Sequence, residues 1–253
     1  MDWRKAYSVN CMFEFLTLRA QNFSDVPAND DWLSAGEREV LAGLRFPKRR
    51  NDWRLGRWTA KQAISAFLRH ATDADLSRFE IRAADDGAPE VFIGNEPAGV
   101  VISISHAGGR GFCAAGPPGL ALGCDVEQLA PRNELLATDF FTPNEIELTR
   151  KATPEKIVLI TNLIWSAKES VLKALREGLR RDTRDISIQP ELSEWAEREN
   201  GWRLWTGYCL KTSREFSGFW HADSLFVYTV TAGSPRLVTF ENPKINACNR
   251  TES

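Results

Sequence analysis

A four-residue breaker near the middle of the chain limits how its 253 residues can fold. Gly116-Pro117-Pro118-Gly119 ends any regular element, because proline lacks a backbone N–H and glycine is costly to order. On each side of this breaker the pattern runs from strand to helix to strand. We therefore predict two halves, residues 1–118 and 119–253, with ample chain to build a core.

The composition is that of an ordinary globular protein, with 43% hydrophobic and 26% charged residues. A net charge of −2 gives no global attraction to nucleic acid or membrane, so any anion site has to be local. No apolar run approaches the roughly 18 residues that span a bilayer, and Met1–Lys5 lacks a signal-peptide core. Five scattered cysteines without a Cys-x-x-Cys pair favour reduced thiols in the cytoplasm over zinc or disulfides.

Local patterns predict the elements of both halves. In the first half we expect strands over 11–18, 100–104 and 111–115, a helix from the capping box Ser34–Glu37 through Leu44, and a long helix over 48–69. In the second half we expect strands over 120–127, 185–188, 202–211 and 225–232, a helix from the capping box Thr142–Glu145, and a long helix from Thr153 to Gly178. We find no sequence repeat between the halves.

The long helix of the second half places an acid and an ammonium on one side. Trp165, Glu169 and Lys173 are four residues apart and share a helix face, where an ordinary surface ion pair is one interpretation. On the preceding strand Asp125 and Glu127 are two apart and point to the same side. If the two stretches meet, three carboxylates converge on one hard cation, for which Mg²⁺ is the natural candidate.

A basic stripe lies on the long helix of the first half. At 3.6 residues per turn, Arg50, Arg54, Arg57 and Lys61 fall into one line. Four like charges in a line repel each other, so the stripe predicts an anionic partner, with a solvated basic face as the alternative. A nucleic-acid partner is a further alternative, but the acidic balance elsewhere and the lack of a module signature count against it.

A Ser-His pair followed by glycines ends the strand over 100–104. Ser105 and His106 are adjacent on an extended chain and point oppositely, so they do not form a nucleophile–base pair. No Gly-x-Ser-x-Gly elbow is present either. Gly108 and Gly109 permit close backbone approach by a ligand. A histidine with a purely structural role is the alternative.

Taken in order, these stretches resemble one enzyme family. Gly-Cys-Asp-Val-Glu at 123–127, followed by Trp-Ser-Ala-Lys-Glu-Ser-Val-Leu-Lys at 165–173, resembles the paired signature of the 4′-phosphopantetheinyl transferases, and more narrowly of their pseudo-dimeric, Sfp-type branch. Phe-Pro-Lys-Arg-Arg at 46–50 with Leu-Gly-Arg at 55–57 resembles the N-terminal arginine motif of that family, and the Ser-His stretch resembles its Ser-His-x-x-Gly motif. The resemblance covers about residues 45–190.

The resemblance implies an α+β fold of two similar α/β subdomains related by a pseudo-twofold axis. The subdomain 1–118 would bind the phosphates of coenzyme A, and the subdomain 119–253 would carry the metal and the catalysis. The implied reaction is Mg²⁺-dependent transfer of the 4′-phosphopantetheine group of coenzyme A to a serine of an apo acyl- or peptidyl-carrier protein, releasing adenosine 3′,5′-bisphosphate. This is the activity of a holo-[acyl-carrier-protein] synthase type transferase, with Mn²⁺ as an alternative metal.

The resemblance and the chemistry together assign roles to individual residues. The expected metal ligands are Asp125, Glu127 and Glu169. The expected catalytic residues are Glu169 as general base, directly or through a metal-bound water, Lys173 as partner of the leaving phosphate, and His106. The expected coenzyme A contacts are Arg49, Arg50, Arg57, Ser105, His106, Lys168 and Lys173, with the choice among Lys48, Arg49 and Arg50 left open.

One position departs from the family pattern. The family often has Gly-Lys-Pro where this chain has Gly87-Ala88-Pro89, so a lysine contact to coenzyme A is either missing or supplied by another cation. An inactive relative that only binds coenzyme A or a carrier protein is therefore the alternative function. We expect a monomeric cytoplasmic protein whose partners are coenzyme A and a carrier protein, and neither nucleic acid nor membrane. The pathway served by the carrier is left open.

Overall fold

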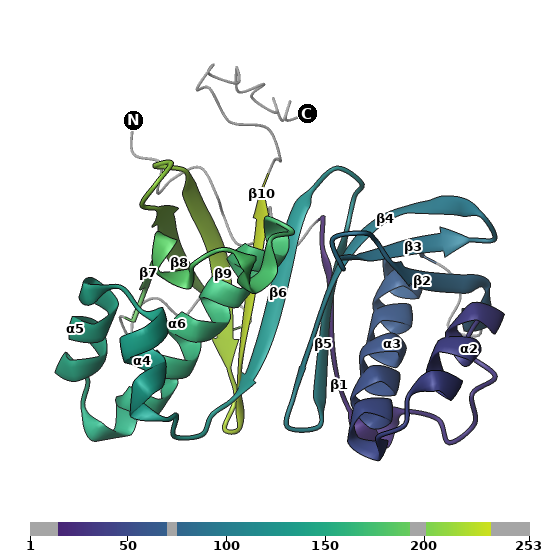
Figure 1. Ribbon diagram of the computed structural model, residues 1–253, viewed down its shortest axis with the longest axis horizontal. Helices are drawn as coiled ribbons and strands as arrows, with labels where there is room; N and C mark the ends of the chain where they lie inside the picture. The colour runs from purple at the N-terminus through teal and green to yellow at the C-terminus, as the bar shows by residue number, and fades with distance from the viewer. Residues whose placement is uncertain (1–14, 70–74, 193–200, 234–253) are drawn as a thin grey trace, which may run out of the picture.

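Two antiparallel sheets stand side by side in the computed structural model, which describes residues 15–69, 75–192 and 201–233 (Figure 1). The helices lie on the two outer sides of the molecule, α2 and α3 beside one sheet and α4, α5 and α6 beside the other. Between the sheets lies a shared core of apolar side chains from both halves. No helix in these described ranges is long and apolar enough to cross a membrane.

The first half contributes five strands and its helices in a simple order. These elements are β1 (Thr17–Asn22), η2 (Phe23–Asp25), α2 (Ala35–Gly43), α3 (Pro47–Phe67), η3 (Leu76–Arg78), β2 (Phe79–Ala83), β3 (Pro89–Ile93), β4 (Glu96–Ala107) and β5 (Arg110–Gly116). The second half follows with β6 (Ala121–Gln128), α4 (Glu134–Phe140), α5 (Pro143–Lys151), α6 (Pro154–Ala174), η4 (Gly178–Arg180), η5 (Thr183–Asp185), β7 (Ile186–Pro190), β8 (Arg203–Cys209), β9 (Glu215–Ala222) and β10 (Phe226–Gly233).

The two sheets have the same topology. Their strand orders are β1-β5-β4-β3-β2 and β6-β10-β9-β8-β7, so in each half the first strand pairs with the last and the others follow as a meander. In each half the long helix, α3 or α6, comes directly after the first strand and its short companion helices. The predicted α+β fold with two similar subdomains is therefore confirmed.

Both predicted capping boxes are present and start the companion helices. At the start of α2 the Ser34 hydroxyl accepts from the Glu37 backbone N–H at 3.1 Å, and the Glu37 carboxylate accepts from the Ser34 N–H at 3.0 Å. At the start of α5, Thr142 and Glu145 exchange the same two bonds at 3.4 and 2.7 Å. Each box satisfies two backbone donors that a helix start would otherwise leave unpaired.

The glutamate of the first capping box is also half of a buried ion pair. Glu37 lies 2.6 Å from the ammonium of Lys61 on α3, and its other oxygen accepts from the Ile81 backbone N–H of β2 at 3.2 Å. Lys61 is fully buried and donates to three backbone carbonyls besides. A buried charge is tolerated only when it is paired and hydrogen-bonded, so this pair fixes α2, α3 and β2 to one another.

The second half repeats this arrangement. Glu145 lies 2.9 Å from the ammonium of Lys168 on α6 and accepts from the Ile188 backbone N–H of β7 at 2.7 Å. The Lys168 ammonium donates to backbone carbonyls of Thr183 and Ile186. The same carboxylate–ammonium joint therefore fixes companion helix, long helix and second strand in both halves.

When the sequences of the two halves are aligned on Lys61 and Lys168, a short sequence repeat becomes visible. Trp-Thr-Ala-Lys-Gln at 58–62 corresponds to Trp-Ser-Ala-Lys-Glu at 165–169. Our finding of no repeat was wrong here, because the repeat is only a few residues long and its meaning lies in a buried partner far along the chain. Gln62 stands where the second half has Glu169, so only one half carries the carboxylate.

Several predicted boundaries differ from the structure by a few residues, among them both ends of β4 (Glu96–Ala107, predicted over 100–104), and two differences have a clear physical reason. Of the strand predicted over 11–18, residues 11–14 lie outside the described residues, and β1 begins at Thr17 and continues to Asn22. Its second half is exposed or half-buried, and within the described residues β1 pairs with β5 alone, at the edge of the sheet. Polar residues on an edge strand look like a loop in sequence.

The long helix α6 ends at Ala174 and not at Gly178, as we predicted. Arg176 takes the left-handed conformation with a φ of 58°, and the backbone N–H groups of Arg176 and Glu177 bond back to the carbonyls of Lys173 and Leu172. These two bonds are a Schellman motif, which usually has glycine at the left-handed position. Because Arg176 and not glycine occupies this position, the sequence carried no signal for the end of α6 at Ala174, and we predicted the end at the next glycine, Gly178.

Candidate active site

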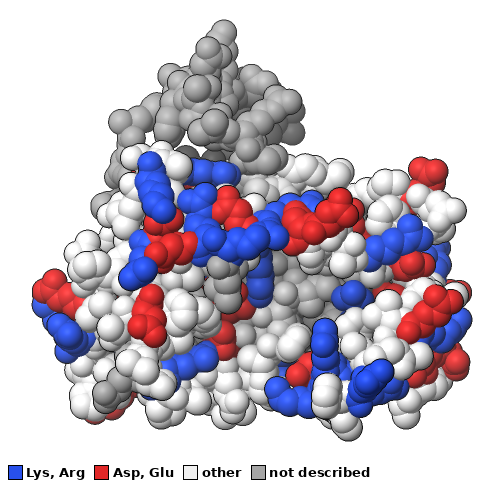
Figure 2. All heavy atoms as spheres, viewed as in Figure 1, with Lys and Arg blue, Asp and Glu red and all other residues white. Residues whose placement is uncertain are grey.

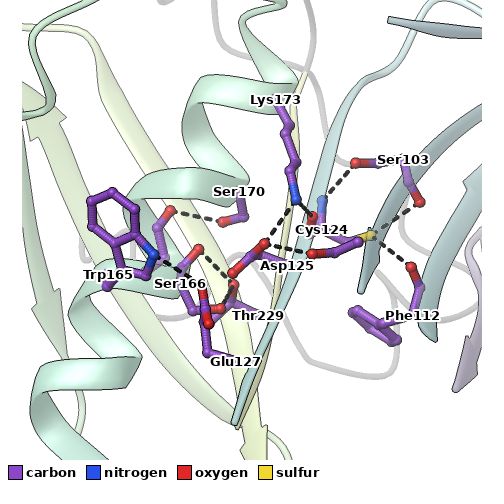
Figure 3. A network of polar contacts seen from close by, with 12 residues as sticks. Ser103, Phe112, Cys124, Asp125, Glu127, Trp165, Ser166, Ser170, Lys173 and Thr229 are labelled. Carbon is purple, nitrogen blue, oxygen red and sulfur yellow. Dashed lines mark hydrogen bonds and ion pairs between the residues drawn. The ribbon is translucent and has the colours of Figure 1, made fainter. Parts of the chain in front are cut away.

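Strand β6 and helix α6 pack unusually closely at the centre of the second half. A Cβ added to Gly123 on β6 would lie 1.7 Å from the carbonyl oxygen of Ser170 on α6, so only glycine allows this approach. The approach brings Asp125 and Glu127 on the strand toward the face of α6 that carries Trp165 and Lys173 (Figure 3). The predicted meeting of the two stretches is therefore what the fold produces.

Asp125 is the centre of this meeting. One of its carboxylate oxygens, Oδ1, accepts from the Lys173 ammonium at 2.7 Å and from the Ser105 hydroxyl at 2.7 Å. Lys173 also donates to the backbone carbonyl of Cys124 at 3.1 Å. The other oxygen, Oδ2, is buried and has no hydrogen-bond partner among the described residues. Because Ser105 lies on β4, both halves of the chain contribute to this group.

Glu127 is held by two side chains. Its Oε1 accepts from the Trp165 indole N–H at 2.8 Å, and its Oε2 is bonded to the Arg132 guanidinium. Burial and the nearby charge of Asp125 raise the pKa of the Glu127 carboxyl group, while Arg132 and Trp165 oppose that shift. The ionised form of Glu127 therefore depends on these two donors.

Glu169 is half-buried on the same helix face. Burial and the charge of Asp125 raise the pKa of its carboxyl group, and Lys173 opposes the shift. Burial disfavours the charge of Lys173, but Asp125, the Cys124 thiol and Glu169 outweigh it and raise the pKa of that ammonium. The carboxylates thus repel one another, and each favours a nearby cation.

These observations fit a hard divalent cation. The buried, unpartnered Oδ2 of Asp125 is an acceptor without a donor, which is costly unless a cation or proton reaches it. Burial, and after it the charge of Asp125, raises the pKa of the carboxyl groups of both Glu127 and Glu169. Within the described residues, however, no three acidic, histidine or cysteine side chains are drawn together as a metal-ligand cluster. The three-carboxylate site stays a prediction that the donor set supports.

Ser105 and His106 point to opposite sides of β4, as predicted. Ser105 is buried against Asp125, whereas His106 is exposed. Partial burial lowers the pKa of the His106 imidazole, Lys173 and Lys48 lower it further, and Asp52 and Asp125 oppose this. Charged groups of the site and of the start of α3 therefore both act on His106, and the neutral form of its imidazole is favoured.

The basic stripe on α3 faces its own chain. Arg50 donates to the backbone carbonyl of Leu41 at 2.6 Å, at the end of α2. Arg54 pairs with Asp30 at 2.9 Å and donates to the backbone carbonyl of Pro27. Asp30 pairs with Arg54, and Glu37 pairs with Arg57 and Lys61, so carboxylates of the protein itself face part of the stripe, whereas Arg50 meets neutral carbonyls.

Arg49 and Arg57 differ in how far their side chains are exposed to solvent. Arg49 is exposed in the first turn of α3. The side chain of Arg57 is only 18% exposed, lies 3.6 Å from Glu37 and stacks over the ring of Trp53 at 4.9 Å. Of the predicted phosphate-binding arginines, Arg49 has the freest guanidinium, and Arg57 is oriented by its neighbours.

The predicted contact of Lys168 with coenzyme A is wrong. Lys168 is fully buried, and its three ammonium donors go to Glu145 and to the carbonyls of Thr183 and Ile186. Its neighbour in sequence, Glu169, faces the site, because adjacent helix positions point about 100° apart. The family motif therefore mixes site residues with a structural lysine.

A cavity of about 600 Å³ adjoins the site where the two halves meet. It is lined by segments 86–89 and 101–104 of the first half and by 119–122 and 172–176 of the second, so Lys173 lies in its wall. Arg176 binds Asp86 at 2.6 and 3.0 Å and Glu90 at 3.0 Å, which holds the pKa of Asp86 down to about 2. Figure 2 shows basic and acidic side chains mixed in a band across the middle of this face. Ala88, the departure from the family pattern, lines the same cavity.

Sequence reasoning missed Arg132 and Arg176. Arg132 follows the Asp-x-Glu stretch by five residues in an Ala-Pro-Arg sequence that carries no periodic signal. Arg176 stood in the predicted helix, and its partners Asp86 and Glu90 lie in the other half. Both roles depend on contacts between distant segments, which a single sequence does not reveal.

Comparison with known proteins finds similarity over the segment that carries the strand and helix motifs. A family model described as the 4′-phosphopantetheinyl transferase superfamily matches residues 121–214, the segment that contains β6 and α6. The 4′-phosphopantetheinyl transferase HetI of Nostoc sp. is 26% identical over 175 residues, covering 68% of this chain and 72% of HetI. The putative 4′-phosphopantetheinyl transferase slr0495 of Synechocystis sp. is 22% identical over 191 residues, which cover 73% of this chain and 76% of slr0495.

Among solved structures, a holo-(acyl-carrier-protein) synthase from Bacillus anthracis in complex with CoA (3′,5′-ADP) aligns with 40% of this chain and 92% of its own. Its sequence identity is 22% and its TM-score 0.35, a likeness too distant to support an argument about this site.

The paired strand and helix motifs are typical of a transferase of this class. Over residues 121–214 the chain is similar to the 4′-phosphopantetheinyl transferase superfamily, and over about 70% of its length it is similar to HetI and slr0495.

Proposed function

We propose that this protein transfers the 4′-phosphopantetheine group of coenzyme A to a serine of an apo acyl- or peptidyl-carrier protein, releasing adenosine 3′,5′-bisphosphate. The observation that carries the proposal is the Asp125 carboxylate, which binds Lys173 and Ser105 through one oxygen and keeps a second, buried oxygen without a partner. Asp125 and Lys173 lie in the segment that matches the superfamily, and Ser105 precedes it.

Asp125, Glu127 and Glu169 would hold Mg²⁺, or Mn²⁺ in its place. When bound, the divalent ion would neutralise and polarise the pyrophosphate of coenzyme A. Asp125 is fixed for this role by Ser105 and Lys173, and Glu127 by Trp165.

Glu169 is the proposed general base. Burial and the charge of Asp125 raise the pKa of its carboxyl group, which makes it a stronger proton acceptor than an ordinary glutamate. It takes the proton of the carrier serine as the serine oxygen forms its bond to the β-phosphorus, and the bond from that phosphorus to the bridging oxygen breaks. Lys173, a firmly charged ammonium, stabilises the negative charge that develops on the leaving phosphate.

The first half is proposed to hold the phosphates of coenzyme A. Arg49 at the start of α3 is exposed, His106 lies in the same electrostatic field, and Arg57 is held in place by Trp53 and Glu37. Arg50 donates to the end of α2 and would contribute with its remaining donors. Ser105 acts through Asp125 on this proposal.

The partners are therefore coenzyme A and a carrier protein, and we infer that the enzyme is a cytoplasmic monomer. Support for the monomer is that a single chain supplies both Ser105 and Asp125, together with both walls of the cavity. No nucleic-acid or membrane partner is proposed.

Intact-mass spectrometry tests the function directly. Apo acyl- and peptidyl-carrier proteins are incubated with the protein, coenzyme A and Mg²⁺, with EDTA as the metal control. We expect an EDTA-sensitive gain of one phosphopantetheinyl group on at least one carrier. Glu169→Gln should abolish the gain, whereas Gln62→Ala, at the equivalent position of the first half, should retain it. Coenzyme A binding without transfer to any carrier would favour the inactive relative.

A further inference from the structure

Glu127 has a resident counter-ion that the proposed reaction does not use. The Arg132 guanidinium is bonded to Oε2 of Glu127, while Trp165 occupies Oε1. Both oxygens of a proposed metal ligand are thus engaged by side chains of the protein. A divalent cation that binds Glu127 through Oε2 has to displace Arg132 from that oxygen.

Arg132 is held in this position from behind. Its Nε donates to the side-chain carbonyl of Asn162 on α6 at 2.6 Å, and Asn162 is fully buried. The Asn162 amide in turn donates to the backbone carbonyls of Ala130 at 2.9 Å and Val158 at 2.8 Å. A buried amide with all these bonds satisfied has one orientation, so the guanidinium is aimed at Glu127 and does not drift across the surface.

The charges of the site support the same role. The three carboxylates Asp125, Glu127 and Glu169 are balanced by two cations, Lys173 on Asp125 and Arg132 on Glu127. The Arg132 side chain is 28% exposed and that of Glu127 17%, so solvent screens their attraction only in part. A guanidinium this close also repels an incoming divalent ion directly.

We propose that Arg132 is a positioning residue that competes with the divalent cation for Glu127 and thereby weakens binding of the free metal. The proposal rests on the proposed function, because it takes the three carboxylates as the metal site. It predicts that removing the charge of Arg132 strengthens metal binding. A purely structural role of Arg132 predicts the opposite, since a loosened Glu127 would bind metal less well.

The experiment measures binding of Mn²⁺ to the full-length protein without coenzyme A, from the signal of free Mn²⁺ in electron paramagnetic resonance, with Mg²⁺ as competitor. Arg132→Gln should lower the Kd roughly tenfold, the order expected for losing one unit charge near a divalent ion. Arg132→Lys keeps the charge and should stay close to the wild-type Kd. Arg181→Gln removes a guanidinium from another Arg–Glu pair, with Glu177, and is the matched control that should leave the Kd unchanged.

An unchanged or higher Kd in Arg132→Gln overturns the proposal, and so does an Arg132→Lys variant that binds as tightly as Arg132→Gln. Absence of Mn²⁺ binding in every variant overturns it as well. Thermal unfolding of each variant reports whether it is folded, and Arg132→Lys serves as the second variant if Arg132→Gln is not. The mass-spectrometric transfer assay is read separately. Tighter Mn²⁺ binding by Arg132→Gln without any transfer would contradict the proposed function alone. Transfer together with an unchanged Kd for Mn²⁺ would contradict only the role of Arg132.

Discussion

The substitution Lys168→Met tests whether Lys168 has a structural role or binds coenzyme A. Lys168→Met leaves Glu145 buried at 1% exposure without its ammonium, although the backbone N–H groups of Thr142 and Ile188 still reach it. Removing one partner of a buried pair typically costs about 3–5 kcal/mol. For a chain of this size, that corresponds to a fall in Tm of roughly 6–20 °C.

The assay is urea unfolding followed by tryptophan fluorescence, with coenzyme A affinity measured by calorimetry at a temperature where the variant is still folded. We expect the free energy of unfolding to fall by about 3–5 kcal/mol while the affinity of the folded protein stays within about twofold. Lys61→Met is the matched control, because it breaks the equivalent joint with Glu37 and should lose a similar amount. A Lys168→Met variant of wild-type stability with coenzyme A affinity reduced tenfold or more would refute this reasoning and restore the sequence-based assignment.

Three further changes test the site. Glu169→Gln removes a carboxyl group whose pKa is raised in the folded state, so it should increase thermal stability at pH 7, and the gain should vanish as the pH falls below about 4.5, where the unfolded glutamate is also protonated; a pH-independent gain would contradict the electrostatic origin. Gly123→Ala should lower the free energy of unfolding by several kcal/mol and abolish transfer, because the new Cβ meets the Ser170 carbonyl, whereas Gly43→Ala, with open space around it, should change stability by less than about 1 kcal/mol. Ala88→Lys adds an ammonium to the cavity wall and should lower the Kd for coenzyme A several-fold in calorimetry at low salt, an effect that raised ionic strength should diminish; an unchanged Kd would show that the phosphates do not reach this wall.

Local signals predicted much of the fold. The two capping boxes were readable because each is complete within four residues and its bonds join near neighbours. The period of two on β6 put Asp125 and Glu127 on one side of the strand, and the period of four on α6 put Glu169 and Lys173 on one face of the helix. The structure joins Asp125 to Lys173 at 2.7 Å. In these cases the geometry of one element decided where the side chain points.

The errors arose where the deciding partner lies far along the chain. Lys168 is next to Glu169 in the motif, but its partners are Glu145, more than twenty residues earlier, and the carbonyls of Thr183 and Ile186. In the same way, Lys61 and Arg54 of the α3 stripe pair with Glu37 and Asp30, which belong to other segments. A helix face can be read from its own period, whereas its neighbour in space cannot.

The pairing of Ser105 with Asp125 has a consequence for how the enzyme behaves on dilution. These residues come from the two halves, so neither half alone can complete the site. Because one continuous chain connects them, the site forms at an effective concentration set by the tether and not by the amount of protein. Specific activity should therefore remain constant down to nanomolar enzyme, where a site shared between two separate subunits would begin to come apart.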